Sequence, residues 1–285
     1  MAAEVRAIKL SARRSDILSR MTNSSITNIY LSPHPDDAVY SCGGMIHRQV
    51  HTGARVVVVT VCTGDPPSGP LSDFAQSLHE RWRPDSHAAA AEVVATRRRE
   101  DLAALDALGA QAVHLDVPDC IYRLNPASGW PLYTSQNALF GSPHPSELTL
   151  IRRTATKLTT LLHGFGRHRL FVPLGIGQHV DHQLARRAAE VAGGVYAYFE
   201  DYPYVANEPG DWAGPGALGP HGRSLTPELV YLAEEDLAAR LDSMARYASQ
   251  LSTFWPDRAG LDQAVQQFAT RTGGQAPAER IWRVA

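Results

Sequence analysis

The chain has 285 residues, of which 44% are hydrophobic, and its 27 Lys and Arg residues nearly balance its 29 Asp and Glu residues. This is enough for a full hydrophobic core, and α/β folds of this size are commonly one domain. The balanced charge gives no overall field that would gather nucleic acid or an anionic membrane surface. We therefore expect a small-molecule substrate that is neutral or zwitterionic.

The cysteines and the N-terminal residues bear on location. Cys42, Cys62 and Cys120 are too few and too scattered for a disulfide framework, so a reducing cytoplasm is the simpler assumption. Residues 1–25 lack the continuous apolar stretch of a signal peptide or membrane anchor. We predict a flexible N-terminal extension over 1–25, a single domain over 26–285, and no membrane partner. The sequence leaves open whether the chain forms a homo-oligomer.

Strands and helices alternate along the chain. The unbroken β-branched run at 55–61 is typical of a parallel strand buried on both faces. Gly109 is a plausible end for the Ala-rich helix predicted at 87–108. The predicted elements are a strand at 26–31, a helix at 43–52, a strand at 55–61, a helix at 87–108, a strand at 112–117, a helix at 146–163, a strand at 169–174, a helix from Asp181 to about 192, a strand at 195–199 and a helix at 234–250. This order predicts an α/β, Rossmann-like three-layer fold with a mostly parallel sheet.

The connections carry two further indications. Three segments rich in Gly, Pro and polar residues, at 64–86, 119–142 and 202–224, are long for connections and are predicted to build the walls of a pocket. No Gly-x-Gly-x-x-Gly motif follows the first strand, where it would cradle a pyrophosphate. A dinucleotide-dependent dehydrogenase is therefore excluded, and a glycosyltransferase that uses a nucleotide sugar is disfavoured.

Two clusters of His and Asp residues follow predicted strands. The first is Ser32-Pro-His34-Pro-Asp36-Asp37, and the second is Gln178-His179-Val-Asp181-His182. In an open α/β sheet, side chains at the carboxyl ends of strands line the crevice where ligands bind. One His, one Asp and a distant His can hold zinc, which leaves a carboxylate for proton transfer and one coordination position for water. Each cluster alone is also typical of a polar turn or a helix cap, but their joint occurrence favours a hydrolase site.

Together with Cys42-Gly43-Gly44 and with Arg97-Arg98-Arg99-Glu100 leading to Leu108-Gly109, these clusters resemble the LmbE-like, or PIG-L, family of zinc-dependent N-acetylglucosaminyl deacetylases. The resemblance covers most of the chain. It implies a Rossmann-like deacetylase that binds one Zn2+ per chain.

The resemblance also implies a role for each residue of the two clusters. Zinc would be held by His34, Asp37 and His182, with Asp36 as the base and His179 as the acid or oxyanion stabiliser. The chemistry agrees, because hydrolysis of an amide needs a polarised carbonyl, an activated water and a proton donor.

Asp181 completes the predicted catalytic group. We expect its carboxylate to hold the ring of His179 in position and to stabilise its positive charge, while it also caps the helix that follows.

Five residues are predicted to bind the substrate. The family pattern favours Arg97 or Arg98 as a contact to a sugar hydroxyl or phosphate, although a solvated helix face is the simpler role for an Arg run. Asp119, at the end of a strand, can accept hydrogen bonds from sugar hydroxyls or merely end the strand. Trp82 and Tyr122 can stack on a sugar face, or can form local core beneath the loops.

The predicted function is zinc-dependent hydrolysis of the N-acetyl or N-acyl group of a 2-amino sugar. Ala38 and Val180 depart from the commonest HPDDE and HPDH forms of the family motifs. Together with 97–109, Tyr122-Arg123 and 247–251, these variants resemble the branch of the family that acts on glycosylated natural products more than the branch that acts on thiol precursors. The alternative is a non-catalytic, metal-containing module that binds sugar. An intact Asp36 and His179 disfavour it, because a module that only binds needs neither residue.

Overall fold

The computed structural model describes residues 26–82, 89–208 and 224–284, so the extension predicted over 1–25 lies outside the described residues. Seven strands form one sheet in the order β3-β2-β1-β4-β5-β7-β6. The first five are parallel, whereas β7 is antiparallel to both β5 and β6. The strands are β1 (Thr27–Ser32), β2 (Arg55–Thr60), β3 (Gln111–His114), β4 (His168–Pro173), β5 (Val195–Phe199), β6 (Leu225–Tyr231) and β7 (Ala278–Val284).

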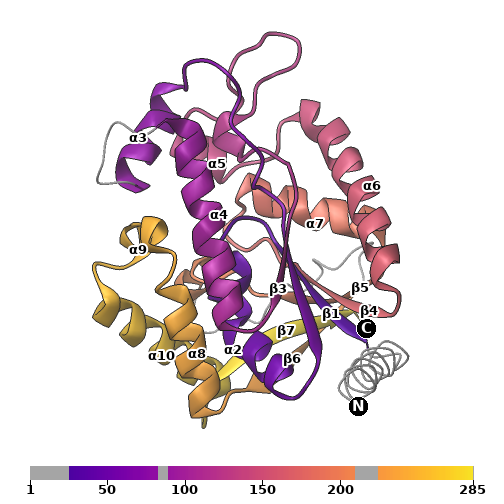
Figure 1. Cartoon of the computed structure of the whole chain (residues 1–285), viewed down its shortest axis with the longest axis vertical. Helices are drawn as coiled ribbons and strands as arrows, with labels where there is room; N and C mark the ends of the chain where they lie inside the picture. The colour runs from indigo at the N-terminus through magenta and orange to yellow at the C-terminus, as the bar shows by residue number, and fades with distance from the viewer. Residues whose placement is uncertain (1–25, 83–88, 209–223, 285) are drawn as a thin grey trace, which may run out of the picture.

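Helices cover both faces of the sheet and extend beyond one end of it (Figure 1). On one face α2, α4, α8 and α10 pack together, and on the other α6 packs on α7. The helices are α2 (Asp37–His51), α3 (Asp73–Trp82), α4 (Ala90–Ala107), α5 (Gln136–Leu139), α6 (Leu148–Phe165), α7 (Val180–Ala192), α8 (Glu234–Met244), α9 (Ala248–Phe254) and α10 (Arg258–Gly273), with short 3-10 turns η1 (Cys120–Tyr122), η2 (Pro145–Glu147) and η3 (Tyr204–Asn207).

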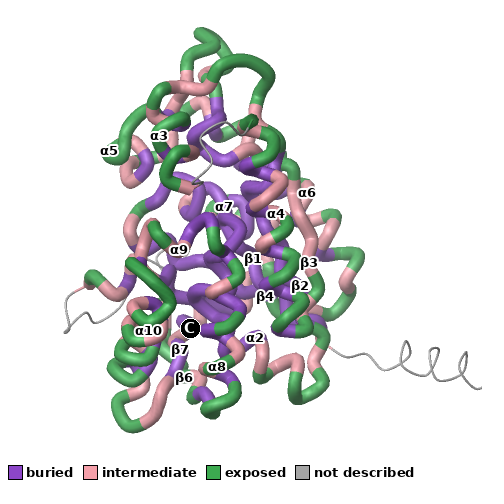
Figure 2. Tube along the Cα trace, turned by 60° about the vertical axis from the view of Figure 1, so that its left-hand side comes forward, coloured by how far each residue is buried: buried purple, intermediate pink, exposed green. Residues whose placement is uncertain are grey.

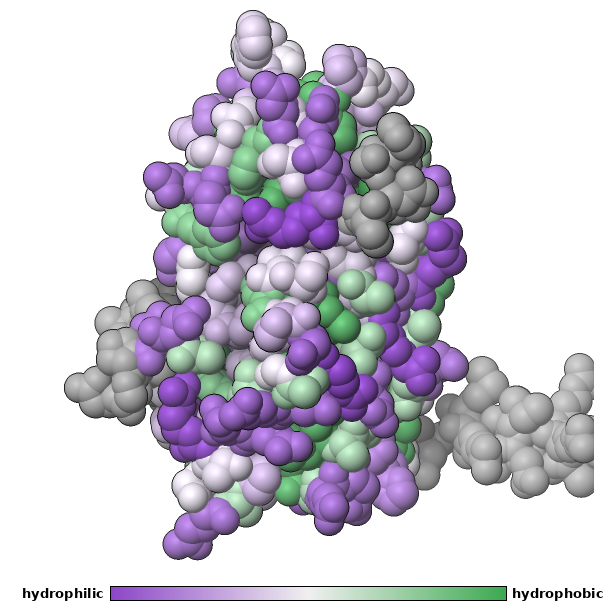
Figure 3. Space-filling view, turned by 90° about the vertical axis from the view of Figure 1, so that its left-hand side faces the viewer, coloured by the Kyte–Doolittle hydropathy of each residue, from purple (hydrophilic) through white to green (hydrophobic). Residues whose placement is uncertain are grey.

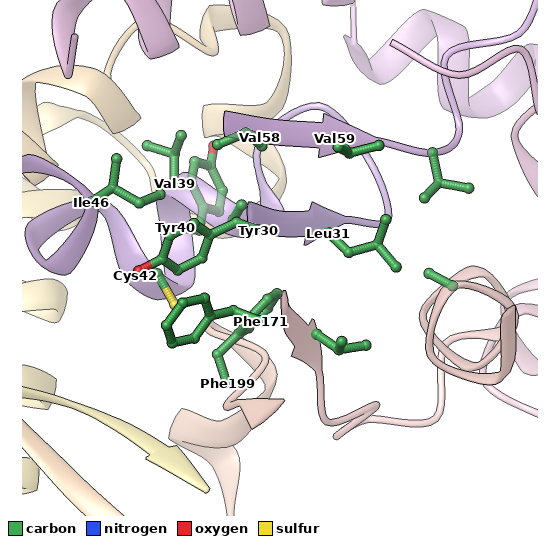
Figure 4. Packing of buried hydrophobic residues seen from close by; sticks show 14 of the residues in the cluster. Tyr30, Leu31, Val39, Tyr40, Cys42, Ile46, Val58, Val59, Phe171 and Phe199 are labelled. Carbon is green, nitrogen blue, oxygen red and sulfur yellow. The ribbon is translucent and has the colours of Figure 1, made fainter. Parts of the chain in front are cut away.

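The core lies on the central parallel strands. Val56 to Val59 of β2 are all buried, as expected for β-branched residues in a strand covered on both faces. Tyr30 of β1 and Phe171 of β4 are register partners and stack with their ring centroids 4.6 Å apart (Figure 4). Burial falls off toward α3 and α5, which lie past the strand ends (Figure 2). The two strands that precede the His and Asp clusters are therefore held rigidly side by side.

The order of the strands creates a switch point between β1 and β4. From β1 the chain adds β2 and then β3 on one side, whereas β4 pairs with the other side of β1 and the chain continues to β5. The connections after β1 and β4 leave on opposite faces, which opens a crevice at their carboxyl ends. The prediction of an α/β fold with a mostly parallel sheet is confirmed, and both clusters lie at this crevice.

The first predicted helix begins too late. Helix α2 begins at Asp37 rather than near residue 43, so the second carboxylate of the motif already belongs to its first turn. Gly43 and Gly44 are sites of close packing inside this helix. A Cβ atom on Gly43 would lie 2.9 Å from the Arg240 side chain, and one on Gly44 would lie 2.7 Å from Leu232.

The C-terminal third departs most from the sequence prediction. The helix predicted at 234–250 is two helices, because α8 ends at Met244 and α9 begins at Ala248. Neither α10 nor the antiparallel pair β6 and β7 was predicted, and the loop predicted over 64–86 contains α3. In the part of the chain that the structure describes, no helix combines the length and the apolar character needed to cross a membrane.

Candidate metal centre

The loops after β1 and β4 bring the two His and Asp clusters together. The ring of His34, from the first loop, has its centroid 4.9 Å from that of His179 and 5.5 Å from that of His182, both from the second. All three side chains are buried. Residues 145 or more positions apart in the chain thus share one site because β1 and β4 are neighbouring parallel strands.

The first loop is fixed by local hydrogen bonds. The Ser32 hydroxyl donates to the His34 carbonyl (2.6 Å) and accepts from the Ala38 amide (3.0 Å), while the Asp37 carboxylate accepts from the His34 amide (2.8 Å). Between them Asp36 has a φ of 124°, a conformation that non-glycine residues rarely adopt. Such strain persists where the surroundings enforce it and is concentrated at functional sites.

The second loop is shaped by glycine. Gly177 has a φ of 81°, and a Cβ atom there would lie 2.9 Å from the ring of Tyr204. Gln178 also has a positive φ, of 61°. The backbone therefore turns sharply just before His179, whose Nδ1 accepts the Asp181 amide at 3.2 Å and caps α7.

The Asp37 carboxylate lies at the spacing of a zinc ligand from each of the two predicted histidine ligands. The Asp37 Oδ2 atom lies 3.1 Å from His34 Nδ1 and 3.3 Å from His182 Nε2. Tetrahedral zinc with bonds near 2.0–2.1 Å separates neighbouring ligand atoms by about 3.3 Å. His182 Nε2 is also buried without a hydrogen-bond partner among the described residues, so this nitrogen is free to bind a proton or a metal ion. The predicted ligands therefore fit zinc.

The predicted set of His34, Asp37 and His182 is not among the most compact groups of ligand-type atoms in the described residues. Within the described ranges, three groups have all their atoms within 4.8 Å of one another: His34, His179 and His182; His34, Cys62 and Asp181; and Cys120, His179 and Asp181. The first group contains both predicted histidine ligands, with His179 in place of Asp37. We favour Asp37 because a carboxylate that contacts both rings also offsets the charge of the cation.

Each predicted histidine ligand has a carboxylate on its other ring nitrogen. His182 Nδ1 bonds to Asp201 at 2.6 Å, and the second oxygen of Asp201 accepts the amides of Gly175 (2.6 Å) and Ile176 (2.8 Å). His34 Nε2 bonds to Asp181 at 2.9 Å. Such carboxylates fix the ring orientation and leave the opposite nitrogen for a metal. Sequence reasoning missed Asp201, although a carboxylate directly after a predicted strand was an available signal.

The electrostatics of the site call for a cation. Burial alone would lower the pKa of His182, but Asp37 and Asp201 raise it to about 10. Burial likewise opposes the charge on His34, yet hydrogen bonds to Asp181 and Asp37 raise its pKa well above the ordinary value. For Asp37, the two histidines outweigh burial and lower its pKa. A proton or a metal ion is therefore strongly favoured between these side chains.

The expected contact and capping role of Asp181 need correction, although its charge does favour the protonated form of His179 and so raises the pKa of that ring. Its carboxylate bonds to His34, to the Cys120 amide (3.0 Å) and to Arg123, and not to His179, and it does not cap α7. Burial would raise the pKa of Asp181, but Arg123 and His34 hold it well below the ordinary value. The reason lies in the fold, because η1 brings Arg123 against the first turn of α7. Arg123 was not assigned a site role from the sequence.

Asp36 and His179 remain beside the predicted ligands with different electrostatics. Burial and the neighbouring Asp37 raise the pKa of Asp36, an effect that Arg97, 3.8 Å away, partly offsets. Burial and the nearby His34 lower the pKa of His179 well below its ordinary value. A carboxyl with a raised pKa suits proton transfer near neutral pH, and an imidazole with a lowered pKa is neutral there.

A pocket of about 250 Å³ opens onto Asp36, Asp37, His34 and His179. Of the predicted substrate-binding residues, the structure places Arg97, Asp119 and Trp82 in its wall. The buried guanidinium of Arg97 pairs with Asp119 at 3.2 Å and lies over the ring of Trp82, 4.8 Å from its centroid. It therefore faces the pocket with a fixed orientation.

The other two predicted substrate-binding residues do not line this pocket. The Arg98 side chain donates to the Thr63 carbonyl and pairs with Asp65 at 2.9 Å. The Tyr122 hydroxyl bonds to His79 at 2.6 Å, and Tyr122 and Arg98 line a smaller neighbouring cavity. Consecutive residues of a helix point about 100° apart, so Arg97 and Arg98 leave α4 in different directions; both line the smaller cavity, but only Arg97 also lines the larger pocket.

Comparisons with known proteins agree with this geometry. Residues 29–192 match the PIG-L family, described as GlcNAc-PI de-N-acetylase. The chain is 30% identical over 190 residues to 2'-N-acetylparomamine deacetylase of Niallia circulans, and 29% identical over 184 residues to that of Streptomyces fradiae, each alignment covering 62% of the chain. These alignments span 66% and 57% of the two relatives, which is less than two thirds of their length.

Solved structures extend the likeness to almost the whole chain. A deacetylase of the teicoplanin biosynthesis pathway superimposes with a TM-score of 0.77 at 27% identity, over 91% of this chain and 98% of that one. The A40926 pseudoaglycone deacetylase Dbv21 superimposes with a TM-score of 0.72 at 28% identity, over 90% and 96%. A teicoplanin deacetylase described as a zinc-inhibited form reaches a TM-score of 0.78 at 27% identity.

Proposed function

Because the chain belongs to the PIG-L family, we propose that it is a zinc-dependent hydrolase that removes an N-acetyl or N-acyl group from a 2-amino sugar. The observation that carries the proposal is the arrangement at the switch point. Asp37 lies within 3.3 Å of ring nitrogens of both His34 and His182, while the neighbouring Asp36 faces the pocket outside this set. One zinc ion per chain fits these three ligands.

Zinc, when bound, supplies a Lewis acid for the amide carbonyl and lowers the pKa of a bound water. The protein side chains account for the proton movements. The Asp36 carboxylate takes the proton of the attacking water and then delivers it to the departing amine nitrogen, for which its raised pKa is suited. The nearby Arg97 guanidinium limits the rise in the pKa of Asp36 and holds its carboxylate toward the pocket.

His179 acts as a neutral hydrogen-bond donor in this proposal. Its Nδ1 accepts the Asp181 amide, so the proton of the neutral ring is on Nε2. Its lowered pKa keeps the ring neutral near pH 7. The Nε2–H group can then donate to the oxygen on which charge develops. Of the two roles predicted for His179, this favours oxyanion stabilisation over acid catalysis.

The relatives suggest the kind of substrate. Their names refer to N-acetylparomamine, teicoplanin and the A40926 pseudoaglycone. We propose an N-acylated amino sugar carried on such a natural product. We further propose a cytoplasmic location, since Cys42, Cys62 and Cys120 are all buried and unpaired, as expected in a reducing compartment. A sugar-binding module without chemistry is a poorer fit, because binding alone does not require the strained, unligated Asp36.

The test is to measure metal content and product release together. Purified protein should contain about one zinc per chain and release primary amine and carboxylate from N-acetylglucosaminides, and chelation should abolish this release. Asp36→Ala should keep the zinc and lose turnover, while Asp106→Ala on the exposed face of α4 should keep both. A metal-loaded and fully active Asp36→Ala enzyme would remove Asp36 from the proposed role.

A further inference from the structure

One wall of the pocket comes from the C-terminal part of the chain, beyond the residues that match the PIG-L family. Helix α9 contributes Gln250, Thr253 and Phe254 to the same pocket that Asp36 and Arg97 line. These three residues are spaced i, i+3 and i+4, so they project from one face of the helix. Ser252, on another face, is exposed. In Figure 1, α9 lies below α3 and beside α4, and it packs against both.

Two polar atoms on this face, Gln250 Oε1 and the Thr253 hydroxyl, make no hydrogen bond within the described residues. The Gln250 side chain is only 4% exposed, and its Nε2 donates to the Ser249 hydroxyl at 3.1 Å. No hydrogen bond to its Oε1 atom is found among the described residues, and Gln250 lines the pocket. The Thr253 hydroxyl is buried and also has no partner. Because buried polar groups are nearly always paired, the unpaired Thr253 hydroxyl points to a ligand with a matching polar group, and the Gln250 side chain in the same wall offers a second contact.

The position of this helix is fixed relative to the predicted catalytic residues. Glu100 accepts the Ser249 amide (2.9 Å) and hydroxyl (2.5 Å), and Asp101 accepts the Tyr247 hydroxyl at 2.8 Å. Both carboxylates belong to α4 and follow Arg97 by one helical turn. The α9 wall and Arg97 are therefore held by the same helix, which is the rigidity that recognition of a small ligand requires.

An aromatic ring completes the wall. Phe254 lies next to Gln250 on the pocket side and packs against Tyr204, with ring centroids 6.2 Å apart. On the side of the molecule that carries α3 and α9, hydrophilic side chains alternate with small hydrophobic areas (Figure 3). An apolar ring beside unpaired polar atoms in a small pocket matches a sugar, which has hydroxyls at its edge and C–H groups on its faces.

We propose that the face of α9 formed by Gln250, Thr253 and Phe254 determines specificity by reading the hydroxyl groups of the substrate's sugar ring. Gln250 Oε1 accepts a hydrogen bond from one ring hydroxyl, the Thr253 hydroxyl bonds to a neighbouring oxygen, and Phe254 packs on the C–H face. This inference rests on the proposed function and narrows its substrate class to amino sugars whose ring hydroxyls are free on the side facing α9.

The experiment pairs enzyme variants with deoxy substrates. The methyl glycoside of N-acetylglucosamine and its 3-, 4- and 6-deoxy analogues are incubated with zinc-loaded enzyme, and kcat/KM is measured from released amine. The unaltered enzyme should lose about tenfold in kcat/KM on at least one deoxy analogue. Gln250→Leu should lose about tenfold on the parent glycoside but less than twofold on that analogue, because the hydrogen bond is already absent there.

Two further variants keep the test decisive. If Gln250→Leu does not fold, Thr253→Val, which preserves the shape of the side chain, is compared on the parent glycoside and the deoxy analogues in the same way. The control Gln263→Leu, on the exposed side of α10, should have the kcat/KM of the unaltered enzyme on every substrate. Equal slowing of the parent and of all deoxy analogues by Gln250→Leu, or no slowing at all, would overturn the inference. Absence of amine release by the unaltered enzyme from every glycoside would instead overturn the proposed function.

Discussion

Zinc binding should depend steeply on pH because His182 must give up a proton to become a ligand. Its pKa of about 10 means that the metal-free protein carries a proton there at pH 7, three pH units below that value. Displacing this proton costs about 4 kcal/mol at pH 7, at 1.36 kcal/mol per unit. Because His182 holds this proton only when no metal is bound, raising the pH increases the apparent affinity for zinc. The increase is about tenfold per pH unit while the pH stays below about 10.

Between pH 6 and pH 8 the apparent zinc affinity should therefore rise at least about 100-fold. The raised pKa of His34 adds to this rise wherever His34 is also protonated. Competition with a chromophoric chelator gives the affinity, and calorimetry in two buffers of different ionisation enthalpy gives the protons released, expected to be at least one per zinc. Replacing the exposed His163 by Gln should leave the slope unchanged. An affinity that changes less than threefold over this range would refute the reasoning.

Three further predictions follow from single contacts. Asp201→Asn should weaken zinc binding 10- to 100-fold at pH 8. It should also flatten the pH dependence of the zinc affinity, because it removes an anion that raises the pKa of His182. An unchanged dependence of the affinity on pH would contradict this. The free energy of unfolding of Asp36→Gly, measured in denaturant, should be about 1–2 kcal/mol higher than that of Asp36→Ala, because glycine accepts the φ of 124°. Equal free energies would argue against backbone strain at residue 36. Arg123→Met should lower the free energy of unfolding by about 3–5 kcal/mol, because it removes the cation that the buried carboxylates of Asp181 and Glu147 share. Arg99→Met on an exposed position should change this free energy little, and similar losses for both variants would exclude the explanation.

The parallel half of the fold was predictable because its signals are local. The buried β-branched run of β2 and the strand β5, observed at Val195–Phe199 as predicted, carry their pattern within a few residues. The antiparallel strands β6 and β7 were not predicted. Strand β6 is largely exposed and β7 lies at the end of the chain, so their pairing depends on segments about 50 residues apart.

In the candidate site, too, the residues close together in the chain were predictable and the contacts between distant segments were not. His34, Asp36 and Asp37 were predicted together because a turn of four residues after a strand holds them near one another. The partner of Asp181 was predicted incorrectly, since the choice between His34 and His179 depends on side-chain directions in two different loops. Arg98 was separated from Arg97 by the angle between adjacent residues on α4.

By itself, the sequence determined the family, the α/β class and the residue types that can hold a metal, because each is encoded in short motifs and in the alternation of strands and helices. The tertiary structure alone decided which nitrogen of each histidine is free, that Asp201 supports His182, and that α9 closes the pocket. These depend on contacts between segments far apart in the chain, whose geometry is set by packing across the whole sheet.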